Sequence, residues 1–140
     1  MEIGINWLTV ILATLAGMAV AMVWYSNWGL FAKAWEKQTG ITQEKLRNAQ
    51  GRKPFMILFV ANFAAALALT IAITITSEYF NDDSIWLALT VGFAAWLGLS
   101  ATTLWQHNTF EMKSSKLTAI NNGYQLTLFL AIALVVGLFQ

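Results

Sequence analysis

The chain has 140 residues, a net charge of +1 and no cysteine. Only 11% of its residues are charged, against about 25% in an ordinary soluble domain, and its mean hydropathy is +0.60. The absence of cysteine excludes disulfides, thiolate metal sites and cysteine catalysis. Because no basic stripe with interleaved aromatic residues occurs, we expect no nucleic-acid partner.

Four apolar segments are long enough to cross a bilayer, which takes about 20 residues. The first, residues 5–25, could be mistaken for a cleaved signal peptide, but Glu2 precedes it instead of the lysine or arginine of a signal, so we expect a retained helix. The other three also lack Asp, Glu, Lys and Arg and cover residues 54–77, 84–107 and 117–139. The sequence therefore predicts one domain (1–140), an all-α integral membrane four-helix bundle.

Residues 27–53 form the largest predicted segment outside the spans. In GLFAKAWEKQTG (29–40), apolar side chains that include Phe31 and Trp35 share one helical face, and Gly40 is a natural helix end. This pattern predicts a short amphipathic helix along the inner leaflet, and residues 42–51 read as a second short helix. The segment either only connects two spans or docks a partner through Phe31 and Trp35.

The eight basic residues predict the orientation of the spans. Six lie between the first and second spans, and Lys113 and Lys116 lie between the third and fourth. The connection at 78–83 has none, so the basic loops are predicted to be cytoplasmic and both termini outside. The interfacial aromatic residues agree, with Trp7, Tyr79 and Trp86 at the outer edge and Trp24, Tyr25, Trp28 and Trp105 at the inner one.

Small residues recur at four-residue spacing in the spans, and the glycines of these rows are Gly17, Gly98 and Gly123. Such rows let helix backbones approach closely in lipid, where no hydrophobic force drives helices together. They suit a compact bundle and could equally form a subunit interface.

Polar side chains gather near the predicted cytoplasmic end. One face of the fourth span carries four of them: Thr118, Asn121, Asn122 and Gln125. A stripe of the third span carries four more, with Asn108 beside it: Ser100, Thr103, His107 and Glu111. At 1.5 Å per residue, Asn62 lies about 12 Å from Pro54, and Asn122 and Gln125 lie about 9 Å and about 13 Å from Lys116, so the three depths agree. Because these groups are costly in lipid, they should turn inward and form a polar cluster.

The polar cluster has two interpretations. Asn and Gln often bond across transmembrane helices, at about 0.6 kcal/mol per contact, or the cluster is a ligand or transport site. His107 and Glu111, one turn apart, could ligate a metal, but only two ligands are visible and both lie near the headgroups, so we favour a hydrated pair. No phosphate loop, H-E-x-x-H or G-x-S-x-G motif occurs, and we expect neither an enzyme nor a cofactor.

Three stretches carry a family resemblance: NWL…WYS…FAKAW…G (6–40), ATTLWQHNTFE (101–111) and K-L-x-x-I-N-x-G-Y (116–124). They resemble the bacterial membrane proteins grouped as domain of unknown function 1761, over essentially the whole chain. One departure is Asn27-Trp28, where a proline is expected soon after WYS. The resemblance implies four spans and a bacterial inner membrane, and no activity. It draws attention to Trp24, Tyr25, Ser26, Asn108, Glu111, Asn121 and Tyr124.

These observations favour a homo-oligomer in the bilayer that binds or passes a small polar solute through the polar cluster. The ligand or pathway candidates are the seven family residues together with Asn62, His107, Asn122 and Gln125, and the interface candidates are Phe31, Trp35, Gly17, Gly98 and Gly123. The alternative is a structural or assembly subunit of a larger membrane complex, docked through residues 27–53.

Overall fold

The computed structural model describes residues 4–140, and all regular structure in that range is helical. Four helical runs are long and apolar enough to cross a membrane: α1 (Trp7–Tyr25), α4 (Lys53–Phe80), the run Ile85–Phe110 and α7 (Ser115–Phe139). The third run consists of α5 (Ile85–Ala95), the π-helical η1 (Trp96–Ala101) and α6 (Thr102–Phe110). The predicted all-α, four-span, multi-pass membrane protein is therefore confirmed.

Polar caps set the helix ends. Asn6, Ser84 and Ser114 each accept a hydrogen bond from a backbone N–H in the first turn of α1, α5 and α7. The α4 helix runs three residues past the predicted end of its span and stops at Asn81, which adopts the left-handed conformation with φ of 51°. Hydropathy marks the apolar part of a helix, whereas the cap marks its end, so the two boundaries differ.

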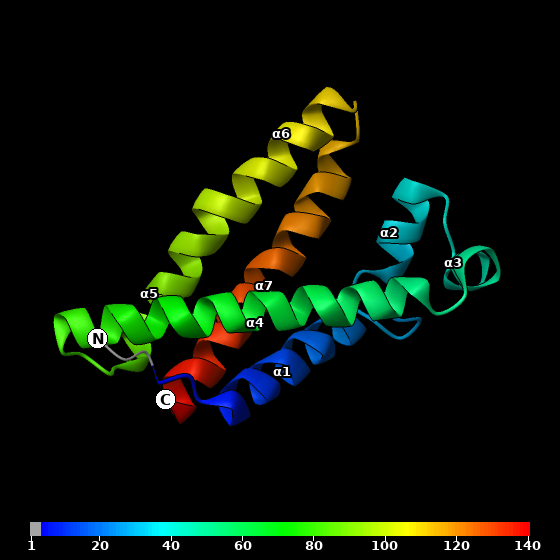
Figure 1. Ribbon diagram of the computed structural model, residues 1–140. Coiled ribbons are helices and arrows are strands. Elements are labelled where there is room, and N and C mark those ends of the chain that lie inside the picture. The colour runs from blue at the N-terminus through cyan, green and yellow to red at the C-terminus, as the bar shows by residue number, and fades with distance from the viewer. Residues whose placement is uncertain (1–3) are drawn as a thin grey trace.

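The two ends of the bundle differ in what they carry. Both termini lie at one end, which we call the termini end, where the Asn6 amide and the Thr9 hydroxyl both donate to the Phe139 carbonyl oxygen (3.2 and 3.0 Å; Figure 1). The segment between α1 and α4 and the turn between α6 and α7 lie at the other, the basic end. This arrangement agrees with the predicted topology, and the assignment of the basic end to the cytoplasm remains a prediction from the charges.

The termini half of the bundle is tightly packed. Val10, Ile73, Ile132 and Val136 have no exposed surface and form its centre. Gly92 lies so close to α7 that a Cβ there would approach the Ala133 Cβ to 2.6 Å. The centre of this half is therefore filled by side chains, as expected for a protein interior packed close to crystal density.

The three candidate interface glycines have different surroundings. A Cβ on Gly17 would come within 2.8 Å of Asn62 Oδ1, and one on Gly123 within 3.1 Å of the Trp24 ring. These two glycines therefore allow close packing inside the subunit. Gly98 is exposed, and a Cβ there would meet no atom of residues 4–140 within 4 Å. Of the three, only Gly98 presents a free surface.

The segment between α1 and α4 holds two short helices, α2 (Ala32–Thr39) and α3 (Gln43–Gln50). The aromatic side chains near α2 turn toward the bundle: the Phe31 ring lies 4.4 Å from that of Trp24, and the Trp35 ring lies 5.9 Å from that of Tyr25, centroid to centroid. Both side chains are half-buried. The two residues considered for docking a partner therefore pack largely within their own chain.

Toward the basic end, α4 diverges from α6 and α7 (Figure 1). Many side chains on this half of α4 are exposed, and Phe55, Met56 and Val60 each keep more than 60% of their surface. In a membrane this surface meets lipid or another subunit. The divergence opens the bundle at the depth where the sequence predicted a polar cluster.

Candidate functional site

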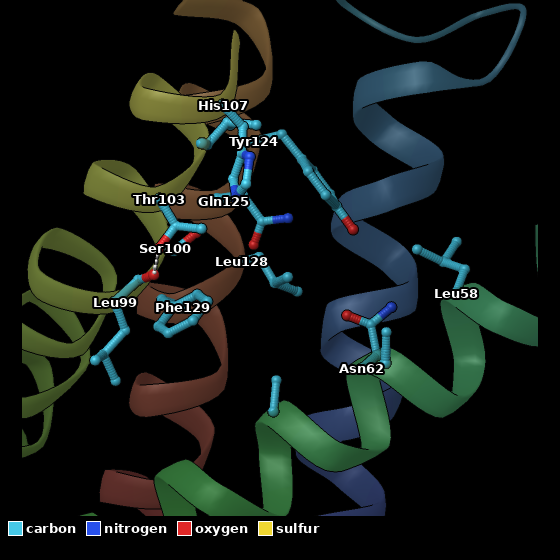
Figure 2. Close-up of a pocket in the computed structure, with 13 residues that line it drawn as sticks. Leu58, Asn62, Leu99, Ser100, Thr103, His107, Tyr124, Gln125, Leu128 and Phe129 are labelled. Carbon is cyan, nitrogen blue, oxygen red and sulfur yellow. Dashed lines mark hydrogen bonds between the residues drawn. The ribbon is translucent and has the colours of Figure 1, made fainter. Parts of the chain in front are cut away.

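A cleft of about 520 Å³ lies between α4 and the η1–α6 run, with α7 as its floor (Figure 2). We call it the α4–α6 cleft. Its polar lining consists of six side chains: Asn62, Ser100, Thr103, His107, Tyr124 and Gln125. Leucine, alanine and phenylalanine side chains form the rest of the wall. Of the three residues expected at similar depth, Asn62 and Gln125 line this cavity and Asn122 does not.

The third span turns its polar side chains toward the cleft through a π-helical segment. In η1, hydrogen bonds join residues five apart instead of four, so the segment takes in an extra residue and rotates the faces of α6 relative to those of α5. Ser100 ends up on the cleft side together with Thr103 and His107. Neither proline nor a charge marks residues 96–101, and the regular helical spacing of the sequence did not reveal the extra residue.

Asn62 forms the α4 side of the polar lining. Its side chain is 1% exposed, and its amide donates to the Met18 sulfur at 3.3 Å. A thioether is a weak acceptor, so much of the hydrogen-bonding capacity of this amide remains unused. Gly17 makes room for the amide, because any side chain at that position would collide with it.

Two buried polar atoms of α7 lack a partner in the described part of the chain: the Tyr124 hydroxyl and Asn122 Oδ1. Tyr124 is 6% exposed, and its ring extends from α7 toward α4 and Asn62 (Figure 2). Asn122 does not line the cleft, and its backbone carbonyl accepts a bond from Trp96 Nε1 at 3.2 Å. Buried polar groups are nearly always paired, so the Tyr124 hydroxyl marks a place for water or a ligand.

The aromatic residues at the end of α1 fasten it to α7. Trp24 Nε1 donates to the Ile120 carbonyl oxygen at 3.1 Å, and the Tyr25 hydroxyl donates to Asn121 Oδ1 at 2.6 Å. The Tyr25 and Tyr124 rings meet edge to face at 5.0 Å. Trp24 and Asn121 were candidate pathway residues, and neither lines the α4–α6 cleft. In this structure both join helices.

A second cleft of about 430 Å³ lies between α1, α4 and the short helix α3. Methionines of α1 and Phe55 line its interior, Arg47 lies on its α3 side, and Tyr25 and Ser26 contribute to its wall. The Ser26 hydroxyl donates to the Met22 carbonyl oxygen. Leu58 and Tyr124 line both clefts, so these two side chains form the partition between them.

A comparison with family models decides the family of the chain. The model described as "Protein of unknown function (DUF1761)" matches residues 8–137. The chain belongs to the DUF1761 family. No curated protein and no solved structure matches this DUF1761 chain.

Two of the motif residues that indicated the DUF1761 family lie outside the clefts. Asn108 is 3% exposed, and its amide donates to the Thr118 hydroxyl at 3.1 Å, which joins α6 to α7. Glu111 is at the surface and pairs with Lys113 at 2.8 Å. The hydrogen bond and positive charge of Lys113 hold the pKa of the Glu111 carboxyl below its usual value. Glu111 does not line the α4–α6 cleft.

Within residues 4–140 of the DUF1761 protein, no three His, Cys, Asp or Glu side chains come close enough together to hold a metal ion. His107 lines the α4–α6 cleft, whereas Glu111 forms its pair with Lys113 instead. Only one of the two side chains considered as metal ligands therefore lines the cleft.

Proposed function

We propose that this DUF1761 protein binds a small, uncharged polar solute in the α4–α6 cleft. The observation that carries the proposal is the cleft itself, with six polar side chains around about 520 Å³ of space and the unpartnered Tyr124 hydroxyl among them. Asn62 and Gln125 offer amide donors and acceptors. A ligand with hydroxyl or amide groups matches this lining, and its apolar part would contact the leucines.

The charge of the lining supports an uncharged solute. Among the described residues, no Asp, Glu, Lys or Arg lines the cleft. A charged ligand moved from water to the interior of a membrane protein needs a counter-charge, because the local dielectric constant is low. A neutral solute needs only hydrogen-bond partners, which the cleft supplies.

The packing supports entry from the basic end. The termini half is closed by fully buried side chains such as Val10, Ile73 and Ile132, whereas α4 stands away from α6 in the other half. Since the positive-inside rule assigns the basic loops to the cytoplasm, the solute would come from the cytoplasm of a bacterial cell and the protein would lie in its inner membrane.

The oligomeric part of the proposal rests on two exposed surfaces. The basic half of α4 and the face of the third span around Gly98 have no partner within residues 4–140. A second copy of the chain could cover either one, and small residues such as Gly98 favour close helix contact in lipid. We therefore propose a homo-oligomer. Light scattering would measure the protein mass of the detergent-solubilised particle. A mass equal to one 15.5 kDa chain would contradict the homo-oligomer.

The binding test uses two neighbouring threonines. Thr103 lines the cleft and Thr102 does not, yet each donates its hydroxyl to the carbonyl four residues earlier. The thermal unfolding of the purified protein would be measured with glycerol, erythritol, glucose or acetamide. A ligand at ten times its Kd raises the free energy of unfolding by about 1.4 kcal/mol. We expect at least one compound to raise the melting temperatures of the wild type and of Thr102→Val. The same compound should raise the melting temperature of Thr103→Val by a smaller amount. Equal responses of both variants would contradict the proposal.

A further inference from the structure

A separate polar cavity lies at the termini end, across the packed core from the α4–α6 cleft. Its volume is about 220 Å³, and it lies between the start of α1, the end of α4 and the turn that precedes α5. Four hydroxyl side chains line it: Thr9, Thr70, Thr74 and Ser77. We call it the termini-end cavity. The proposed binding of a neutral solute makes no use of it.

Two of the four hydroxyl groups of this cavity already donate their protons within the protein. Thr9 donates its proton to the Phe139 carbonyl oxygen at 3.0 Å, and Thr70 donates to the Ala66 carbonyl oxygen at 2.7 Å. The Asn6 amide, also at the cavity, donates to Phe139 as well. A hydroxyl whose proton is already engaged offers only its lone pairs to a ligand. The hydroxyls of Thr9 and Thr70 therefore present oxygen lone pairs to the cavity.

Ser77 adds an independent sign of a missing partner. Its side chain is 4% exposed, and its Oγ has no hydrogen-bond partner in the described part of the chain. A serine in a membrane helix normally satisfies itself by bonding to the carbonyl one turn earlier, as Thr70 does here. The unsatisfied, buried Ser77 hydroxyl lines the same cavity, which indicates that the cavity holds something that pairs with it.

The charge of the cavity selects the kind of ligand. Glu78 and Asp83 line it, and among residues 4–140 no Lys, Arg or His does. Two carboxylates above a set of hydroxyl acceptors attract positive charge and repel anions. We propose that the termini-end cavity binds a small cation, held by Glu78, Asp83 and the Ser77 hydroxyl.

Size limits which cations fit. A bare metal ion would fill little of the 220 Å³. Ca²⁺ needs six to eight oxygen ligands, and water molecules supply some of them at sites with few carboxylates. A hydrated divalent metal ion and a small alkylammonium ion both match the volume. Both are bound by the same oxygen acceptors, so separate titrations distinguish them.

The test compares two carboxylates of the cavity with one beside it. Protein in a non-ionic detergent would be titrated by calorimetry with CaCl₂, MgCl₂ and methylammonium chloride at constant ionic strength. The variants Glu78→Gln and Asp83→Asn remove a charge at the cavity, and Asp82→Asn removes one from an adjacent position that does not line it. All three residues are exposed, so the variants should fold as the wild type does.

We expect at least one cation to bind the wild type, and Glu78→Gln and Asp83→Asn to raise its Kd about tenfold or more, as the loss of a nearby charge predicts. Asp82→Asn should change the Kd less than about twofold, because an exposed charge farther from the ligand is screened. Binding of Ca²⁺ or Mg²⁺ alone identifies a metal site, and binding of methylammonium alone identifies an ammonium site. If none of the three binds, or if the cavity variants bind as tightly as Asp82→Asn, the proposal is wrong.

Discussion

Replacing Asn122 by leucine should stabilise the protein or leave its stability unchanged. The side chain is 9% exposed, and its Oδ1 has no partner in the described residues. A buried acceptor left unpaired costs about 1–3 kcal/mol, and leucine has a similar volume and no polar atom. A gain of about 1 kcal/mol would raise the melting temperature by roughly 3 °C in a chain of this size. The measurement is thermal unfolding in detergent, followed by tryptophan fluorescence.

The matched control is the same substitution at Asn108. This asparagine is also buried, at 3% exposed, but its amide donates to Thr118, so Asn108→Leu removes a hydrogen bond between α6 and α7. It should lower the stability by about 0.6 kcal/mol, and by at most about 1.7. If both variants lose stability to the same extent, Asn122 has a partner, such as a water or a second subunit, and the reasoning from its unpaired oxygen fails.

Three further predictions follow from the packing, the surface charges and the topology. Gly92→Ala should destabilise the bundle, because its Cβ would come within 2.6 Å of α7, whereas Gly98→Ala should leave the subunit's thermal stability unchanged. Because Lys113 lowers the pKa of Glu111, the stabilisation from this carboxylate is present above its unfolded-state pKa and is lost as the pH falls through the folded value. Lys113→Met should therefore raise the Glu111 pKa in an NMR titration, and an unchanged value would contradict the assignment. A single cysteine at Lys45 should resist an impermeant thiol reagent added outside intact cells, and its labelling would reverse the predicted topology.

The fold could be predicted because it depends on properties that are summed over many residues. Four apolar runs of sufficient length leave few alternatives in a bilayer, where every backbone polar group must be satisfied within the helix. The depth match placed Asn62 and Gln125 beside one cleft, because the rise of a helix is fixed and the start of each span is marked by a charge or a proline, but Asn122, the third residue of that match, does not line the cleft. Both arguments need positions along the helix axis only.

The details of the site depend on rotation about the helix axis, which the sequence did not settle. Glu111 shared a predicted stripe with His107, but it is the C-cap of α6, at the surface, where its side chain pairs with Lys113. The aromatic pair Trp24 and Tyr25 was considered for a pathway, and its contacts with α7 could not be inferred without knowing which helices are neighbours.

The termini-end cavity gave almost no signal in the sequence. Thr70, Thr74 and Ser77 share one face of an otherwise apolar helix, but such residues usually satisfy their hydroxyls within the same helix. They line a cavity only because α1, α4 and α7 converge at that end, with the polar start of α1 beside them. The α4 stripe alone does not reveal which residues of the other helices and of the turn face it.

The contact between α1 and α7 has a consequence for the biosynthesis of the protein. The bonds from Asn6 and Thr9 to Phe139 and from Trp24 to Ile120 join residues 96 to 133 positions apart. The first helix thus enters the membrane long before its principal partner, α7, has been synthesised. At a synthesis rate of about 5–20 residues per second, this delay lasts roughly 10 s. During this interval the face of α1 around Ala13 and Gly17 contacts lipid or the insertion machinery. Assembly of the bundle must therefore follow the insertion of all four spans, and any factor that shields a waiting helix would act on α1.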